Sequence, residues 1–114
     1  MKDSRVYLIH IRDCINRVKQ YTVDGKAAFI DDIKTQDAVL RNLQVMCESV
    51  QKLPSEWKGA YPEIEWSNIA GFRNRLTHDY LIVDLNLVWN VIETYLPELE
   101  ETIKAMAQEF WNVK

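Results

Sequence analysis

Four polar side chains of complementary chemistry lie within residues 73–80: Arg73, Asn74, His78 and Tyr80. An arginine guanidinium binds anions through planar, paired hydrogen bonds. A histidine imidazole accepts or donates a proton near neutral pH. The amide and the phenol complete the set around these two groups. These residue types predict a site that transfers protons beside a bound anion.

Residues 66–80 form a predicted helix whose apolar stripe consists of Trp66, Ile69, Phe72 and Leu76. Arg73 projects close to this stripe. On a regular helix Arg73 and His78 are about 140° apart around the axis and about 7.5 Å apart along it. Asn74 and His78, four residues apart, share one face. The polar groups therefore converge best if the helix breaks near His78 or if a second copy of the chain contributes.

A structural interpretation of the same residues stays open at this point. An arginine beside an apolar stripe can simply be paired with a carboxylate, and a single histidine is more often structural than catalytic. Metal binding is not expected, because His10 and His78 are the only histidines and no Cys/His or His-Glu-x-x-His cluster occurs. The sequence also lacks a glycine-rich phosphate loop and the Gly-x-Ser-x-Gly turn of hydrolases.

The composition predicts one domain, spanning residues 1–114, with enough hydrophobic residues (47%) for a single core. A net charge of -3 and a pI near 5.4 argue against a broad electrostatic attraction to nucleic acid, so any RNA contact must be local. No long apolar run or signal-like leader occurs, and we expect a cytoplasmic protein that contacts no membrane. Cys14 and Cys47 fit two core thiols better than a disulfide.

Apolar periodicity predicts an all-α fold, and the three Gly and three Pro are too few for a many-stranded sheet. Four long helices are expected at about residues 4–22, 35–53, 66–80 and 84–106, with a short element at residues 28–30. A loop runs through Gly59 and Pro62, Asp84 is the predicted N-cap of the last helix, and Pro97 should kink that helix. The predicted fold class is an antiparallel bundle of four main helices plus a short fifth.

Residues 73–80 match the pattern R-x-x-x-x-H-x-Y, and the chain resembles the HepT branch of the HEPN superfamily over nearly its whole length. Further matching blocks are Asp37-Ala38-Val39 with Arg41-Asn42-Leu43, Pro62-Glu63-Ile64 with Trp66, Ile69-Ala70-Gly71, Val83-Asp84, Trp89 and Leu96-Pro97-Glu98-Leu99. The chain departs from the pattern at Met46-Cys47-Glu48, where Gly commonly precedes Glu, and at Phe72, where Met is usual. Both departures concern helix packing more than chemistry.

The resemblance implies a HEPN-like helical homodimer that cleaves RNA, such as tRNA or mRNA, without a metal or other cofactor. In such proteins the two copies of the motif face each other across a cleft. His78 would take the proton from a ribose 2′-hydroxyl or give one to the leaving 5′-oxygen, and Arg73 would neutralise the charge that grows on the phosphorane. Asn74 would orient the phosphate or His78.

A polar stripe on the second long helix, formed by Asp37, Arg41, Gln44 and Glu48, has two interpretations. The resemblance suggests that Asp37, Arg41 and Glu48 line the cleft as supporting residues. The simpler interpretation is a solvated helix face that carries an Asp37–Arg41 ion pair. The two interpretations differ in the partner that they give Asp37, and a structure shows that partner.

The resemblance also implies a partner, because HepT-like toxins are encoded beside a minimal nucleotidyltransferase (MNT), an antitoxin that transfers AMP to the motif tyrosine. In this chain that residue is Tyr80. A bulky, negatively charged group there would block the cleft and repel phosphate. The expected protein is thus the toxin of a toxin–antitoxin pair. Two alternatives are a catalytically idle HEPN subunit of a nucleotidyltransferase complex and a plain helical interaction protein, which would leave the motif unexplained.

Overall fold

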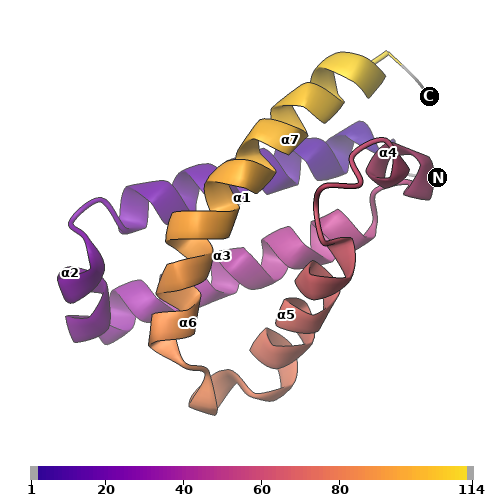
Figure 1. Cartoon of the computed structure of the whole chain (residues 1–114). Coiled ribbons are helices and arrows are strands. Elements are labelled where there is room, and N and C mark those ends of the chain that lie inside the picture. Colours follow the sequence, from indigo (N-terminus) through magenta and orange to yellow (C-terminus); the bar gives the residue numbers. More distant parts are fainter. Residues whose placement is uncertain (1–2, 113–114) are drawn as a thin grey trace.

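The computed structural model describes residues 3–112, and all the regular elements in that range are helical. Figure 1 shows α1 (Arg5–Tyr21), α2 (Lys26–Asp31), α3 (Ile33–Gln51), α4 (Ser55–Gly59), α5 (Trp66–His78), the 3-10 turn η1 (Tyr80–Ile82), α6 (Leu85–Asn90), the π-helical turn η2 (Val91–Tyr95) and α7 (Leu96–Phe110). The predicted all-α bundle of four main helices is confirmed. The first two and last two residues of the predicted 1–114 domain lie outside the described range.

The centre of the bundle is the antiparallel pair of α1 and α3, with α5 packed on α3 and α7 crossing α1 (Figure 1). The buried stripe of α1 consists of Leu8, Ile11, Cys14, Ile15 and Val18. Each such side chain contributes about 1.5–3 kcal/mol when it leaves water, so this stripe orients the helix. Cys14 and Cys47 are free and buried, which confirms them as core thiols.

α3 begins earlier than predicted because Asp32 caps it. The Asp32 carboxylate accepts hydrogen bonds from the Thr35 hydroxyl at 2.6 Å and from the backbone N–H of Lys34 at 3.2 Å. These bonds, the one from Thr35 foremost, hold the pKa of Asp32 below its ordinary value. Before α2 the chain turns at Gly25, whose φ of 92° favours glycine.

The predicted loop through Gly59 and Pro62 is partly wrong, because this segment contains the short helix α4. Trp57 of α4 is buried. Its ring stacks on that of Phe110 in α7, with centroids 5.2 Å apart and planes 7° from parallel. Burial of this large aromatic surface against a distant part of the chain stabilises a helix too short to persist alone.

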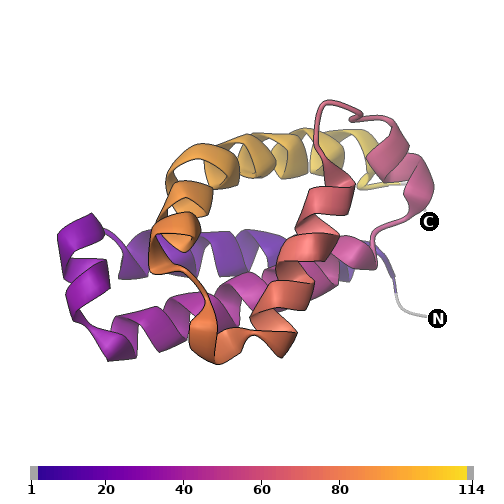
Figure 2. The same ribbon diagram turned by 60° about the horizontal axis from the view of Figure 1, so that its bottom comes forward.

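The last long helix changes direction between α6 and α7, as Figure 2 shows. Asp84 caps α6 as predicted and accepts a hydrogen bond from the Asn86 backbone N–H at 2.9 Å. The π-helical turn η2 ends at Tyr95, two residues before Pro97, which occupies the first turn of α7. Proline lacks the backbone donor and its ring crowds the preceding turn, so a wider turn at this point relieves the conflict.

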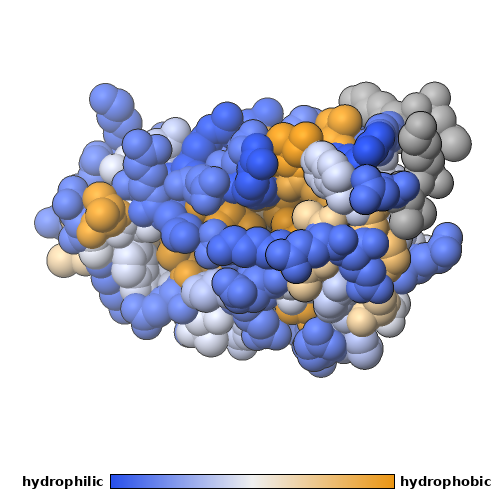
Figure 3. All heavy atoms as spheres, turned by 90° about the horizontal axis from the view of Figure 1, so that it is seen from above, coloured by the Kyte–Doolittle hydropathy of each residue, from blue (hydrophilic) through white to orange (hydrophobic). Residues whose placement is uncertain are grey.

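Polar side chains cover most of the face seen in Figure 3, and hydrophobic residues show in the gaps between them. This distribution follows from the amphipathic helices, which turn one stripe inward and leave the other in water. Within residues 3–112 no helix combines the length and the apolar character that a bilayer crossing requires.

Candidate functional site

The motif side chains are carried by the last turns of α5 and by the turn that follows. α5 is a helix from Trp66 to His78 and ends because Asp79 leaves the helical conformation (φ -117°, ψ 28°). Tyr80 therefore lies in η1 rather than in the helix, which is two residues shorter than predicted. The break comes directly after His78, so the separation of about 140° between Arg73 and His78 persists within one chain.

Arg73 is half-buried, and among residues 3–112 no carboxylate pairs with it. Its Nε is fully buried without a hydrogen-bond partner. One terminal nitrogen, Nη1, donates to Asn74 Oδ1 over a long 3.4 Å. A buried donor left unpaired costs about 1–3 kcal/mol. The expectation of an arginine simply paired with a carboxylate is thus wrong, and the guanidinium keeps donors for an external anion.

The Arg73 charge also acts on the buried thiol of Cys47 in α3. Burial and, to a smaller extent, the negative charge of Glu48 raise the pKa of Cys47 to about 12, although the positive charge of Arg73 opposes them. Cys47 therefore stays a neutral thiol at physiological pH and does not serve as a counter-ion for the arginine.

His78 and Asn74 are exposed side chains of α5 that lie four residues apart on one face. His78 is the last residue of the helix. The Asn74 amide oxygen accepts the contact from Arg73, so this amide connects the arginine with the face that carries the imidazole. The arrangement leaves the imidazole and the guanidinium on different faces of one helix.

Tyr80 is tied to α3. Its hydroxyl donates to Asp37 Oδ1 at 2.9 Å. Partial burial, this hydrogen bond and the negative charge of Asp37 raise the pKa of Tyr80 above the ordinary value for a phenol. The ion pairs of residues 3–112 do not include the Asp37–Arg41 pair of the simpler interpretation, although both side chains are exposed, as a solvated face requires.

A second polar link joins α3 to α5 beside the motif. Gln44 Nε2 donates to Thr77 Oγ1 at 3.3 Å and lies 3.5 Å from Glu48 Oε1. Thr77 directly precedes His78, and it follows Arg73 by one helical turn. Gln44 belongs to the predicted polar stripe, whereas Thr77 was not predicted as a site residue. The fourth stripe residue, Arg41, is exposed.

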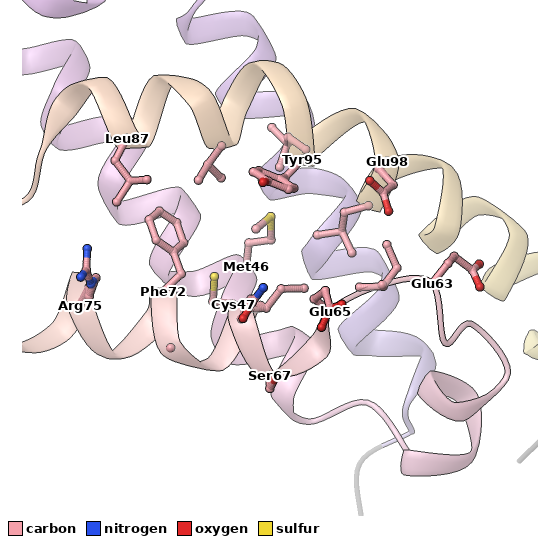
Figure 4. A pocket seen from close by; sticks show the side chains of 17 residues that line it. Met46, Cys47, Glu63, Glu65, Ser67, Phe72, Arg75, Leu87, Tyr95 and Glu98 are labelled. Carbon is pink, nitrogen blue, oxygen red and sulfur yellow. The ribbon is translucent and has the colours of Figure 1, made fainter.

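A separate groove of about 640 Å³ lies between α5 and the α6–α7 segment (Figure 4). Its walls are mostly apolar and include Met46, Phe72 and Leu87. Figure 4 shows Arg75 near one end of the groove, far from the glutamates at the other. None of the four motif side chains lines it, so the groove is distinct from the candidate site.

Comparison with known proteins assigns the chain to a family. The family described as ribonuclease HepT-like matches residues 11–106. The chain belongs to this family. The motif of residues 73–80 lies inside the matched region, as do the α3 residues that contact it.

Relatives of this HepT-like chain come from archaea and bacteria. A Methanocaldococcus jannaschii protein, named as a gamma-glutamylcyclotransferase and proposed RNase, is 36% identical over 112 residues, which are 95% of this chain but 49% of that protein. The chain thus spans about half the length of that relative. A Caldanaerobacter subterraneus protein named as a proposed RNase is 34% identical over 113 residues, 96% of this chain and 98% of its own.

The mRNA nuclease HepT of Shewanella oneidensis is 28% identical over 123 residues, which cover 87% of this chain and 92% of that protein. No solved structure matches the chain significantly. Within the described range of this HepT-like chain, no group of three or more His, Cys, Asp or Glu side chains is placed to hold a metal ion.

Proposed function

We propose that this HepT-like chain is a metal-independent endoribonuclease and the toxin of a toxin–antitoxin pair that acts in the cytoplasm. The observation that carries the proposal is Arg73, a half-buried guanidinium that pairs with no carboxylate of residues 3–112. Its terminal nitrogens make one long hydrogen bond, to Asn74 Oδ1, and keep further N–H donors for an external anion. The names of the relatives indicate that the anion is RNA phosphate.

The proposed cleavage uses the 2′-hydroxyl of the substrate as the nucleophile. His78 takes the proton from this hydroxyl, or gives one to the leaving 5′-oxygen, and a 2′,3′-cyclic phosphate and a 5′-hydroxyl result. Arg73 binds the nonbridging oxygens and stabilises the charge of the phosphorane by paired hydrogen bonds. Asn74, which contacts Arg73, orients the phosphate.

The active unit in this proposal is a homodimer. Arg73 and His78 lie on different faces of α5, and the helix stays regular between them. Two chains related by a two-fold axis can place the Arg73 of one beside the His78 of the other. Asp37, Arg41 and Glu48 of α3 then flank the shared cleft.

Regulation in this proposal is AMP transfer to Tyr80 by a nucleotidyltransferase antitoxin encoded with the chain. The phenol is 38% exposed, so a second enzyme can reach it. An attached AMP adds negative charge to the motif and competes with substrate phosphate for the guanidinium of Arg73.

Purified chain incubated with total RNA, with and without EDTA, tests the nuclease proposal. We expect cleavage in both conditions and 2′,3′-cyclic phosphate ends on the products. His78→Ala should slow cleavage at least about a hundredfold, because the proton-transfer group is lost. His10→Ala, which removes the other histidine from the exposed face of α1, is the matched control and should cleave normally.

Two results would contradict this assignment. Loss of activity with EDTA would show that a metal does the chemistry. A wild-type chain that binds RNA or the nucleotidyltransferase but cleaves nothing would instead support the idle-subunit alternative, which the net charge of -3 favours.

A further inference from the structure

The Asp37–Tyr80 hydrogen bond pairs a nucleophile with a base at an accessible position. Tyr80 Oη donates to Asp37 Oδ1 at 2.9 Å. Tyr80 comes from η1 and Asp37 from α3, so the tertiary fold makes this pair. Both side chains are exposed, and an enzyme that modifies the phenol can reach the pair without unfolding the turn.

A neutral phenol is a weak nucleophile, and its surroundings keep Tyr80 neutral. Burial, the hydrogen bond and the charge of Asp37 raise the pKa of Tyr80, so little phenolate is present at neutral pH. The proton must therefore leave during the attack on an electrophile. A carboxylate that already accepts this proton in a hydrogen bond is placed to receive it, as the catalytic-loop aspartate of protein kinases does for a substrate hydroxyl.

The Asp37 carboxylate is available for this role. Among the ion pairs of residues 3–112, none involves Asp37, although Arg41 lies one turn further along α3. A cation in direct contact would stabilise the carboxylate and make it a weaker base. Asp37 instead directs an oxygen at the reacting atom of Tyr80.

We propose that Asp37 is the general base for nucleotidyl transfer to Tyr80, so that the modified chain supplies part of the machinery for its own modification. This inference rests on the proposed function, in which Tyr80 accepts AMP from ATP. The bond from Tyr80 Oη to the α-phosphorus forms while the bond from that phosphorus to the bridging oxygen breaks. The Oη proton passes to Asp37 Oδ1, and pyrophosphate leaves. The partner enzyme binds and positions the ATP.

Asp37→Asn tests the proposal because it removes the base but retains an oxygen that can accept the hydrogen bond. The measurement is the rate of label transfer from α-labelled ATP to the full chain by its nucleotidyltransferase. We expect kcat to fall about a hundredfold or more, while the KM for the chain stays within about twofold. Asp24→Asn removes the same charge from the exposed turn before α2 and should be modified at the wild-type rate.

A fluorinated tyrosine at position 80 separates proton removal from positioning. Its phenol is more acidic, so its reaction depends less on a base. In chains that carry fluorotyrosine at position 80, the loss of kcat caused by Asp37→Asn should therefore be at least about tenfold smaller. Equal deficits with tyrosine and fluorotyrosine would overturn the proposal in favour of a positioning role. Circular dichroism and thermal melting of each variant show whether it is folded.

The outcomes also separate this proposal from the one on which it rests. If the wild-type chain and Asp37→Asn are labelled at equal rates and Tyr80→Phe is not labelled, Asp37 is not the base. AMP transfer to Tyr80 would then still stand. No label on the wild-type chain would overturn both.

Discussion

Two arginines of this chain stand in opposite surroundings. Near the chain termini, Arg5 forms a two-pronged interaction with the Asp3 carboxylate and donates to the Trp111 carbonyl at 3.1 Å. Its guanidinium also lies 5.6 Å from the centre of the Trp111 ring. In α5, Arg73 pairs with no carboxylate in the described part of the chain, makes one long contact to Asn74 and has a buried Nε without a partner.

The two sets of contacts separate a structural arginine from one that is available to a ligand. Arg5 joins the N-terminal segment to the end of the last helix, and its partners are all internal. The surroundings of Arg73 leave the buried Nε unsatisfied, which costs stability, and leave the terminal nitrogens without a carboxylate. Sites that bind or transform ligands commonly carry such a cost.

The largest expected effect is the difference in RNA cleavage and in melting temperature between Arg73→Leu and Arg5→Leu. Arg73→Leu should reduce RNA cleavage at least about a hundredfold, because no other group replaces the guanidinium at the phosphorane. Its thermal melting temperature should stay unchanged or rise, since an unpaired buried donor is removed. Arg5→Leu should melt at a lower temperature and cleave RNA at the wild-type rate. RNA cleavage assays and calorimetry measure both quantities.

Two results for Arg73→Leu would contradict this distinction between the two arginines. An Arg73→Leu chain that melts far below the wild type would mean that the guanidinium has structural partners. Unchanged cleavage by the same variant would remove Arg73 from the site.

A mixing experiment tests whether Arg73 and His78 act across two chains. Arg73→Leu and His78→Ala should each be inactive alone. Mixed dimers would contain one intact site of the two, and statistical exchange makes half of the dimers mixed, so about a quarter of the wild-type activity should return. The control is a mixture of two preparations of Arg73→Leu, which should stay inactive. Failure of activity to return, with subunit exchange verified, would place the complete site within one chain.

Much of the fold could be predicted from the sequence because the information is local. Apolar residues at three- and four-residue spacing predicted the long helices, and the capping role of Asp84 followed from its type and position. The short helix α4 was missed because Pro54, Gly59 and Pro62 are typical of a loop. What stabilises α4 is the stack of Trp57 on Phe110, a contact that no local pattern reveals.

The candidate site was predictable in its residues but not in its contacts. The resemblance to the HepT pattern singled out residues 73–80, and a helix break near His78 was one of two expected ways to bring their side chains together. The partner of Asp37 was missed because the spacing of Asp37 and Arg41 suggested a pair within α3. The position of η1 after α5 decides instead that the Asp37 carboxylate accepts a hydrogen bond from Tyr80. The catalytic roles of Arg73 and His78 stay predictions.

The smallest effect is expected on the pH dependence of stability, in a comparison of Tyr80 with Tyr61. The Tyr61 hydroxyl donates a hydrogen bond to Glu109 Oε1 at 2.8 Å. Partial burial comes first among the causes that raise the pKa of both phenols above 10.0, and each carboxylate adds to it. Below about pH 9 both phenols are protonated in the folded and the unfolded chain, so these interactions contribute fully. As the pH rises through the unfolded value, the unfolded chain loses its protons first, and the free energy of unfolding falls.

Either Tyr80→Phe or Tyr61→Phe should therefore make the fall in the free energy of unfolding between about pH 9 and 11 shallower. Cys47, whose pKa is also raised, adds the same background to every variant. Urea unfolding at a series of pH values measures the slope. The two variants should differ in function, since AMP transfer should be lost with Tyr80→Phe and persist with Tyr61→Phe. A slope that Tyr80→Phe leaves unchanged, while Tyr61→Phe reduces it, would mean that the Asp37–Tyr80 hydrogen bond is not maintained in solution.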